Sequence, residues 1–148
     1  MVIHEFVPLL ARQGILITRI GLYGWSMGGY GVLYLAEQLG QERVAVAIAE
    51  SPAIWQHSWQ SAGGAFDDAA DWREHNIWPH LAALRGIAVR VDCGAGDGFW
   101  PVTRDLRAGI HPTPAGGIEA GGHDTAFWTS QAPAAIQFAG RHLADTGR

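Results

Sequence analysis

Three residues of this chain have the types and the spacing to do chemistry together. Ser26 lies within "GLYGWSMGGYG", Asp97 within "VDCGAGDGFW" and His123 within "EAGGHDTAFW". A serine hydroxyl is a poor nucleophile unless a neighbouring base removes its proton, and a carboxylate can hold that base in the required tautomer. In the chain order serine, acid, histidine, these residues predict nucleophilic attack on an acyl group.

The serine stands in a motif that is typical of a sharp turn between a strand and a helix. The pattern G-x-S-x-G is matched by Gly24, Trp25, Ser26, Met27 and Gly28. A strand is expected at 17–23 and a helix at 27–40, which is the context of a nucleophile elbow. We expect that side chains at the two flanking glycines would strike the neighbouring strand and helix. The Met27 N–H is then a candidate oxyanion donor at the helix start. The alternative is an ordinary glycine-rich turn.

The base and the acid have competing interpretations. His123 follows the last expected strand, so it can serve as the base, or it can be a capping or exposed loop histidine. Asp97 lies beyond the end of its strand, from where it can reach His123, and it is the predicted acid. Asp92 lies within that strand and is the alternative acid. Asp124 is expected to cap the terminal helix.

The elements that must position these residues alternate between strand and helix. Strands are expected at 17–23, 43–50, 86–94 and 116–122. Helices are expected at 2–13, 27–40, 66–76, 78–86, 99–110 and 125–145, the last bent or starting near Pro133. This alternation predicts an α/β fold, a parallel sheet with helices on both faces. Functional residues of such sheets lie at the carboxyl ends of the strands.

Composition excludes several classes of function. The chain has 148 residues, 48% of them apolar, and a net charge of −4, as expected for one globular domain. No basic cluster indicates a nucleic-acid partner, and no apolar run approaches the ~20 residues of a membrane span. No signal peptide is visible, so we expect a cytoplasmic protein if Met1 is the natural start. Cys93, the single cysteine, excludes an intramolecular disulfide and is expected to be buried.

No metal and no cofactor are expected. The segment "DWREHNIWPH" is the richest in candidate ligands, with Asp71, Glu74, His75 and His80. Their spacing matches no established metal motif.

The three motifs "GWSMGGYG", "VDCGAGDGFW" and "GGHDTAFW" together resemble the α/β-hydrolase superfamily. They are most similar to its esterase D branch of S-formylglutathione hydrolases, feruloyl-type esterases and mycolyltransferase-like esterases. The resemblance extends from about residue 2 to 143. It implies a triad acting through an acyl-enzyme on a small ester or thioester, with Ser26 as nucleophile, His123 as base and Asp97 as acid. It also implies one partial domain over 1–148, containing the last four of eight strands and a lid-like insertion at about 51–86.

The chain departs from this family before the elbow. Family members carry further strands there, and a loop among them supplies the second oxyanion N–H, for which nothing before Ser26 is a counterpart. Loss of one such donor typically costs about 10²–10³ in rate, so we expect a weak catalyst or an unstable chain. The first strand is expected to be an exposed edge that permits self-association. A misassigned start, a broken gene and a fragment are open explanations.

Aromatic residues near the strand ends are candidates for a substrate pocket. They are Trp25, Trp55, Phe99, Trp100, Phe127 and Trp128, of which Trp25, Trp55, Phe99 and Trp100 are predicted to line the pocket. The alternative for each is packing. Hydrolysis and acyl transfer stay open, since the same triad serves both. A non-catalytic remnant that binds a partner is a rival function. A nucleotide-binding domain is a more distant rival, because the glycines do not form G-x-G-x-x-G.

Overall fold

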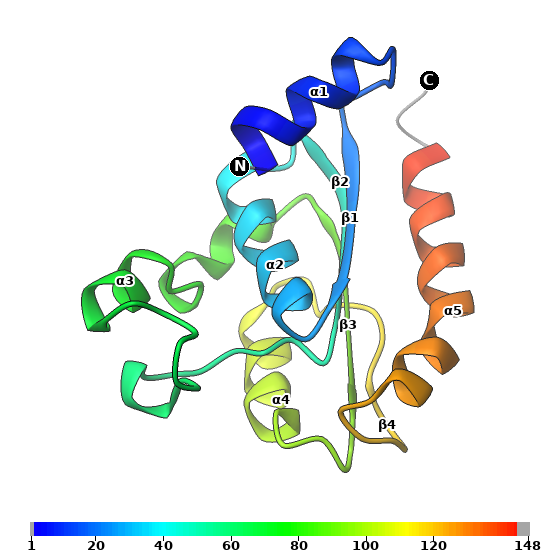
Figure 1. The fold of residues 1–148 in the computed structure, drawn as a ribbon. Helices are drawn as coiled ribbons and strands as arrows, with labels where there is room; N and C mark the ends of the chain where they lie inside the picture. Colours follow the sequence, from blue (N-terminus) through cyan, green and yellow to red (C-terminus); the bar gives the residue numbers. More distant parts are fainter. Residues whose placement is uncertain (1, 145–148) are drawn as a thin grey trace.

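A four-stranded parallel sheet runs through the computed structural model, which describes residues 2–144 (Figure 1). The strands lie side by side in chain order: β1 (Ile20–Trp25), β2 (Val44–Glu50), β3 (Ala88–Gly94) and β4 (Ile118–Glu119). Parallel neighbours require crossover connections, which helices supply here. The predicted parallel α/β sheet is confirmed.

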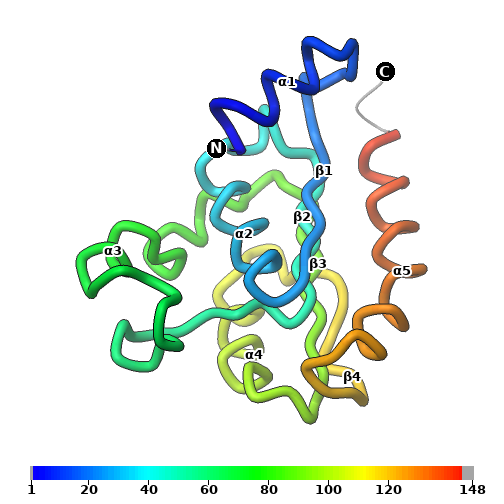
Figure 2. The backbone as a smooth tube through the Cα atoms, in the orientation of Figure 1, coloured from blue at the N-terminus to red at the C-terminus, as the bar shows by residue number. Residues whose placement is uncertain are grey.

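Helices cover both faces of the sheet, as predicted. Helices α2 (Met27–Leu39) and α4 (Trp100–Gly109) lie on one face, and α5 (Thr125–Ala144) lies on the other (Figures 1 and 2). Helix α5 begins at Thr125 and continues through Pro133 rather than starting there. Within residues 2–144, no helix has the length and hydropathy needed to cross a bilayer.

The central strand β2 is buried along its whole length because helices cover both of its faces. Its Ala47 and Ala49 face the main core with α2, while Val46 and Ile48 face the cluster beneath α5. This alternation follows from the two-residue period of a strand. The carboxyl end of β2 is thereby held rigidly beside the ends of β1 and β3.

Some element bounds differ from the expected ones. Strand β4 has two residues instead of seven, because Gly116 adopts a left-handed φ of +82° just before it and interrupts regular pairing. The expected N-terminal helix is divided into a π-helical turn (Val2–Phe6) and α1 (Val7–Arg12), with Pro8 at the start of α1, where proline is tolerated.

The segment 51–86, expected to be a lid-like insertion, has two structurally different parts. It contains two 3₁₀ helices, η2 (Ser58–Gln60) and η3 (Trp78–Leu84), and the helix α3 (Ala69–Glu74). Buried Leu81 and Leu84 of η3 join the core beside α2, so this end belongs to the body of the domain. Helices η2 and α3 contact each other, and Figure 1 shows α3 standing away from the sheet.

Candidate active site

Ser26 occupies a tight turn between β1 and α2. Its φ of 53° and ψ of −123° are unusual for a residue with a side chain, so the backbone is strained there. Neighbouring backbone holds this conformation. The Ser26 N–H donates to the Glu50 carbonyl at 2.9 Å, and the Ser26 carbonyl accepts from the Ala53 N–H at 3.0 Å. The elbow is thus fixed against the end of β2.

The glycines around Ser26 do not all have the same role. A Cβ atom at Gly24 would lie 2.6 Å from the carbonyl group of Gly28, so only glycine fits at Gly24. The prediction that a side chain at Gly28 would strike its neighbours is wrong, because a Cβ there meets no atom within 4 Å. Of the two flanking glycines, only Gly24 excludes a side chain, because the backbone of Gly28 occupies the space that its Cβ would need.

The loops that follow β3 and β4 pack against each other through glycine. The Gly96 N–H donates to the Gly121 carbonyl at 2.8 Å. A Cβ at Gly94 would lie 2.4 Å from the same Gly121 oxygen, which leaves no room for a side chain. This close approach places Asp97, on the first loop, beside His123, on the second.

The structure brings the three predicted catalytic residues into one hydrogen-bonded chain. Nε2 of His123 lies 2.9 Å from Oγ of Ser26, and Nδ1 of His123 lies 2.8 Å from Oδ2 of Asp97. A carboxylate only accepts hydrogen bonds, so the ring hydrogen belongs on Nδ1. Nε2 is then free to accept the Ser26 hydroxyl hydrogen. This is the arrangement in which a histidine can remove that proton.

Asp97 is buried, and its charge is supported by neighbours. Burial raises the pKa of Asp97, but the hydrogen bond from the Phe99 N–H, together with the neighbouring Ser51 and His123 side chains, outweighs burial and lowers it overall. The Phe99 N–H donates to Oδ1 of Asp97 at 2.8 Å, which leaves Oδ2 for His123. The carboxylate is therefore ionised and oriented at neutral pH.

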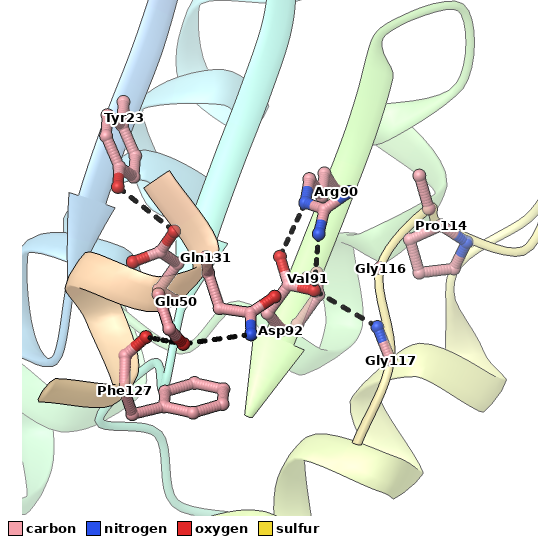
Figure 3. A network of polar contacts seen from close by, with 12 residues as sticks. Tyr23, Glu50, Arg90, Val91, Asp92, Pro114, Gly116, Gly117, Phe127 and Gln131 are labelled. Atoms are coloured by element: carbon pink, nitrogen blue, oxygen red, sulfur yellow. Dashed lines mark hydrogen bonds and ion pairs between the residues drawn. The ribbon is translucent and has the colours of Figure 1, made fainter. Parts of the chain in front are cut away.

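Asp92, the alternative acid, belongs to a different network (Figure 3). Arg90 donates to both of its carboxylate oxygens, from Nε at 2.6 Å and from Nη2 at 2.9 Å, and the Gly117 N–H donates to Oδ1 at 3.2 Å. Burial raises the pKa of Asp92 although Arg90 opposes this. The carboxylate that contacts His123 is thus Asp97.

Aromatic rings support His123 from the side of α5. The Trp128 ring meets the His123 ring edge-on, with centroids 5.2 Å apart, and Trp25 stacks on Trp128 at 6.0 Å. Asp124 accepts the Phe127 N–H at 2.9 Å and caps the start of α5, as predicted. Trp25 therefore packs against the ring that contacts the histidine.

A pocket of about 360 Å³ opens beside the serine. Its lining consists of Ser26, Met27, Ala53, Trp55, Ala62, Gly63, Gly64, Ala65 and Phe99. Of the four predicted pocket residues, Trp55 and Phe99 line it, whereas Trp25 and Trp100 do not. Trp100 is the first residue of α4 and follows Phe99, the N-cap, so the helical rotation turns its side chain in another direction. The Arg104 guanidinium lies 5.6 Å from the centre of the Trp100 ring.

Two features of the site escaped the sequence reasoning. Buried Ser51, with a left-handed φ of 45°, lowers the pKa of Asp97. Its signal was available, since Ser51 follows β2 as Ser26 follows β1. The pocket wall at 62–65 carries no functional groups, so its composition gave no signal.

In the described part of the chain, no group of three or more His, Cys, Asp or Glu side chains is placed to hold a metal ion. His75 contacts Asp71, with Nδ1 of the ring 2.9 Å from Oδ1 of the carboxylate, and packs on the Tyr34 ring with centroids 5.2 Å apart. Asp71 and His75 thus pair with each other, whereas Glu74 and His80 are exposed.

Solved structures resemble this chain over most of its length. A ferulic acid esterase is 23% identical, with a TM-score of 0.77 over 95% of this chain and 59% of that one. The S-formylglutathione hydrolase of Staphylococcus aureus is 19% identical, with a TM-score of 0.73 over 91% of this chain and 61% of that one. A fluorophosphonate-binding serine hydrolase of the same organism, also 19% identical, has a TM-score of 0.73 and coverages of 93% and 62%.

No protein-family model matches the sequence, and no curated protein matches it. The chain spans about three fifths of the length of these similar structures. At such identities the likeness concerns the fold. Together with the parallel sheet and the helices on both of its faces, it shows that this chain has the α/β-hydrolase fold.

Proposed function

We propose that this chain is a serine hydrolase that cleaves a small ester or thioester through an acyl-enzyme on Ser26. The observation that carries the proposal is the hydrogen-bonded chain from Ser26 through His123 to Asp97, with distances of 2.9 and 2.8 Å. The similar structures named as esterases and serine hydrolases support the same reaction class.

His123 acts first as base and then as acid. Its Nε2 takes the hydroxyl proton as Oγ of Ser26 attacks the carbonyl carbon, and it returns that proton to the leaving alcohol or thiol. Asp97 keeps the ring in the tautomer with hydrogen on Nδ1 and stabilises the charged imidazolium. Water then repeats the sequence on the acyl-enzyme and releases the acid.

The negative charge on the substrate oxygen forms at the start of α2. Met27 is the first residue of that helix, so its N–H has no partner within the helix and can donate to the oxyanion. The positive end of the helix dipole supports the same charge.

Covalent capture tests this proposal directly. The purified chain is treated with a fluorophosphonate, and the intact mass is measured. We expect a single adduct on the parent chain, none on Ser26→Ala, and an adduct on the control Ser58→Ala, which changes a serine outside the site. A soluble, folded parent chain without an adduct would overturn the proposal.

The proposed roles of the other two residues predict graded losses. His123→Ala and Asp97→Asn should slow capture by about 10³–10⁴, because either change leaves the hydroxyl without an oriented base. Acyl transfer, the second reaction that this triad serves, is distinguished by adding an alcohol during ester cleavage. A new ester among the products indicates transfer, and free acid alone indicates hydrolysis.

A further inference from the structure

The pocket beside Ser26 has unequal walls. One is formed by the half-buried rings of Trp55 and Phe99, whose centroids lie 5.6 Å apart in an edge-on arrangement. Another part of the lining, 62–65, is made of alanine and glycine and comes from the part of the chain between η2 and α3. No charged side chain lines the pocket. Such a cavity suits an apolar group.

The chemistry of the triad decides which half of an ester can occupy this pocket. The leaving group must receive its proton from Nε2 of His123, so it lies on the histidine side of Ser26. The pocket is lined by Ser26 and Met27, and His123 is not part of its lining, although the Phe99 ring of the lining packs on the His123 ring with centroids 5.3 Å apart. We take a group in the pocket to be attached to the carbonyl carbon opposite the leaving group, which makes it the acyl group.

We propose that this pocket binds the acyl group, that the acyl group is an apolar chain or ring, and that the wall at 62–65 sets its maximum length. This inference rests on the proposed function, because it takes Ser26 as the nucleophile. The wall acts through its small size: methyl groups and hydrogen atoms leave space that longer side chains would fill.

Ala65 is the position at which the proposal is best tested. Ala62, Gly63 and Gly64 also line a second hollow of about 320 Å³, so a side chain added there has two directions to take. Ala65 lines the Ser26 pocket and not that hollow. Ala69 of α3 provides the matched control: it lies in the same insertion, is exposed, and lines the second hollow but not the Ser26 pocket.

The first experiment measures kcat/KM for p-nitrophenyl acetate, butyrate, hexanoate and octanoate. Ala65→Leu should lower the octanoate-to-acetate ratio at least about 10-fold, because the added side chain occupies space that the longer chain needs. Ala69→Leu should change that ratio less than about 2-fold. An unchanged ratio in Ala65→Leu, or an equal change in both variants, would overturn the proposal.

A second experiment does not depend on catalysis and separates this proposal from the proposed function. In the Ser26→Ala background, binding of 2-butanone and 2-octanone is measured by ligand-observed NMR. Each buried methylene is worth about 4-fold in affinity, so the parent pocket should favour 2-octanone, and Ala65→Leu should remove that preference. If esters are not cleaved but this pattern holds, the proposed function fails and the apolar pocket stands. If 2-octanone has no advantage, the pocket proposal fails.

Discussion

Aliphatic side chains fill the face of the sheet beneath α2, α4 and η3, whereas the face beneath α5 combines a small apolar cluster with buried charges. Leu33, Leu84 and Leu106 are among the fully buried residues of the first face. On the α5 face, the apolar cluster around Ile48 and Phe138 gives way to Glu50 and Asp92 towards the carboxyl ends of the strands (Figure 3).

This difference separates apolar packing on one face from buried charge on the other. Glu50 accepts a hydrogen bond from the Tyr23 hydroxyl at 3.0 Å, and burial raises the pKa of Glu50 to about 7. The α5 face therefore holds a group that titrates near neutral pH. It lies beneath the helix that begins two residues after His123. We expect mutations on the first face to change stability alone and changes on the α5 face to depend on charge.

The largest expected effect comes from the aliphatic face. Leu33→Ala should lower the free energy of unfolding by about 3 kcal/mol, because it leaves a cavity in a fully buried site. Ile136→Ala on α5, where the side chain is 65% exposed, is the control and should cost under about 0.5 kcal/mol. Urea unfolding measures both, and equal losses would remove the contrast between the faces.

Asp92→Asn should lower the free energy of unfolding by nearly as much as Leu33→Ala, but for an electrostatic reason. It leaves the Arg90 guanidinium, which is mostly buried, without its charged partner, so we expect a loss of about 3 kcal/mol. Fluorophosphonate capture by the folded fraction should persist. Asp97→Asn should give the opposite result, with weak capture. Loss of capture in both variants at equal folded fraction would show that the two carboxylates are not separate in function.

The titration of Glu50 should change the free energy of unfolding by a smaller amount. Its pH dependence should have the opposite sign to that of a carboxylate whose pKa is lowered by folding. Above pH 4.5 the unfolded chain has released this proton, while the folded protein keeps it up to about pH 7. Stability contributed by Glu50 is therefore present at low pH and is lost as pH rises through 7, by about 2 kcal/mol. Glu37, with a pKa raised by burial to about 8, acts in the same direction.

Unfolding curves between pH 5 and 8 test this expectation. Glu50→Gln should flatten the decline in stability, since glutamine carries no ionisable proton. Glu42→Gln, which changes an exposed carboxylate, should leave the slope as in the parent chain. A parent chain that gains stability over this interval would contradict the assignment.

The smallest effect is expected at β1, the edge strand of the sheet, and concerns association between chains. Among the described residues, β1 pairs only with β2, and Leu16, which is 89% exposed, lies just before it. We propose that chains associate weakly through this edge. Leu16→Lys should weaken concentration-dependent association about 5-fold by light scattering. Trp59→Lys, at an equally apolar exposed site on η2, should not; equal effects would point to non-specific association.

The sequence was sufficient to predict the sheet and the meeting of Ser26, Asp97 and His123. Parallel strands end at one edge, and each of these residues follows a strand within a glycine-rich loop. The direction of individual side chains was not predictable in the same way. Trp25 stacks on Trp128 because of the path of α5, and Trp100 turns away through helical rotation.

The burial of Glu50 and Asp92 beneath α5 could not be predicted from the sequence either. The run 43–50 indicates a buried strand, but nothing in it shows whether its last residue, Glu50, faces solvent or a helix. The short β4 follows Gly116, whose φ is +82°, and the neighbouring Gly117 N–H donates to Asp92 of β3. Such features arise from tertiary contacts, which local patterns do not encode.

The reactivity of Cys93 reports how often β3 opens. This single cysteine is fully buried in β3, four residues before Asp97, and burial raises the pKa of its thiol to about 12. The thiol can therefore lose its proton to water and react with an alkylating reagent only while β3 is separated from its neighbours. Alkylation rates measured with increasing urea would tell whether the strand that carries the acid opens alone or with the whole fold.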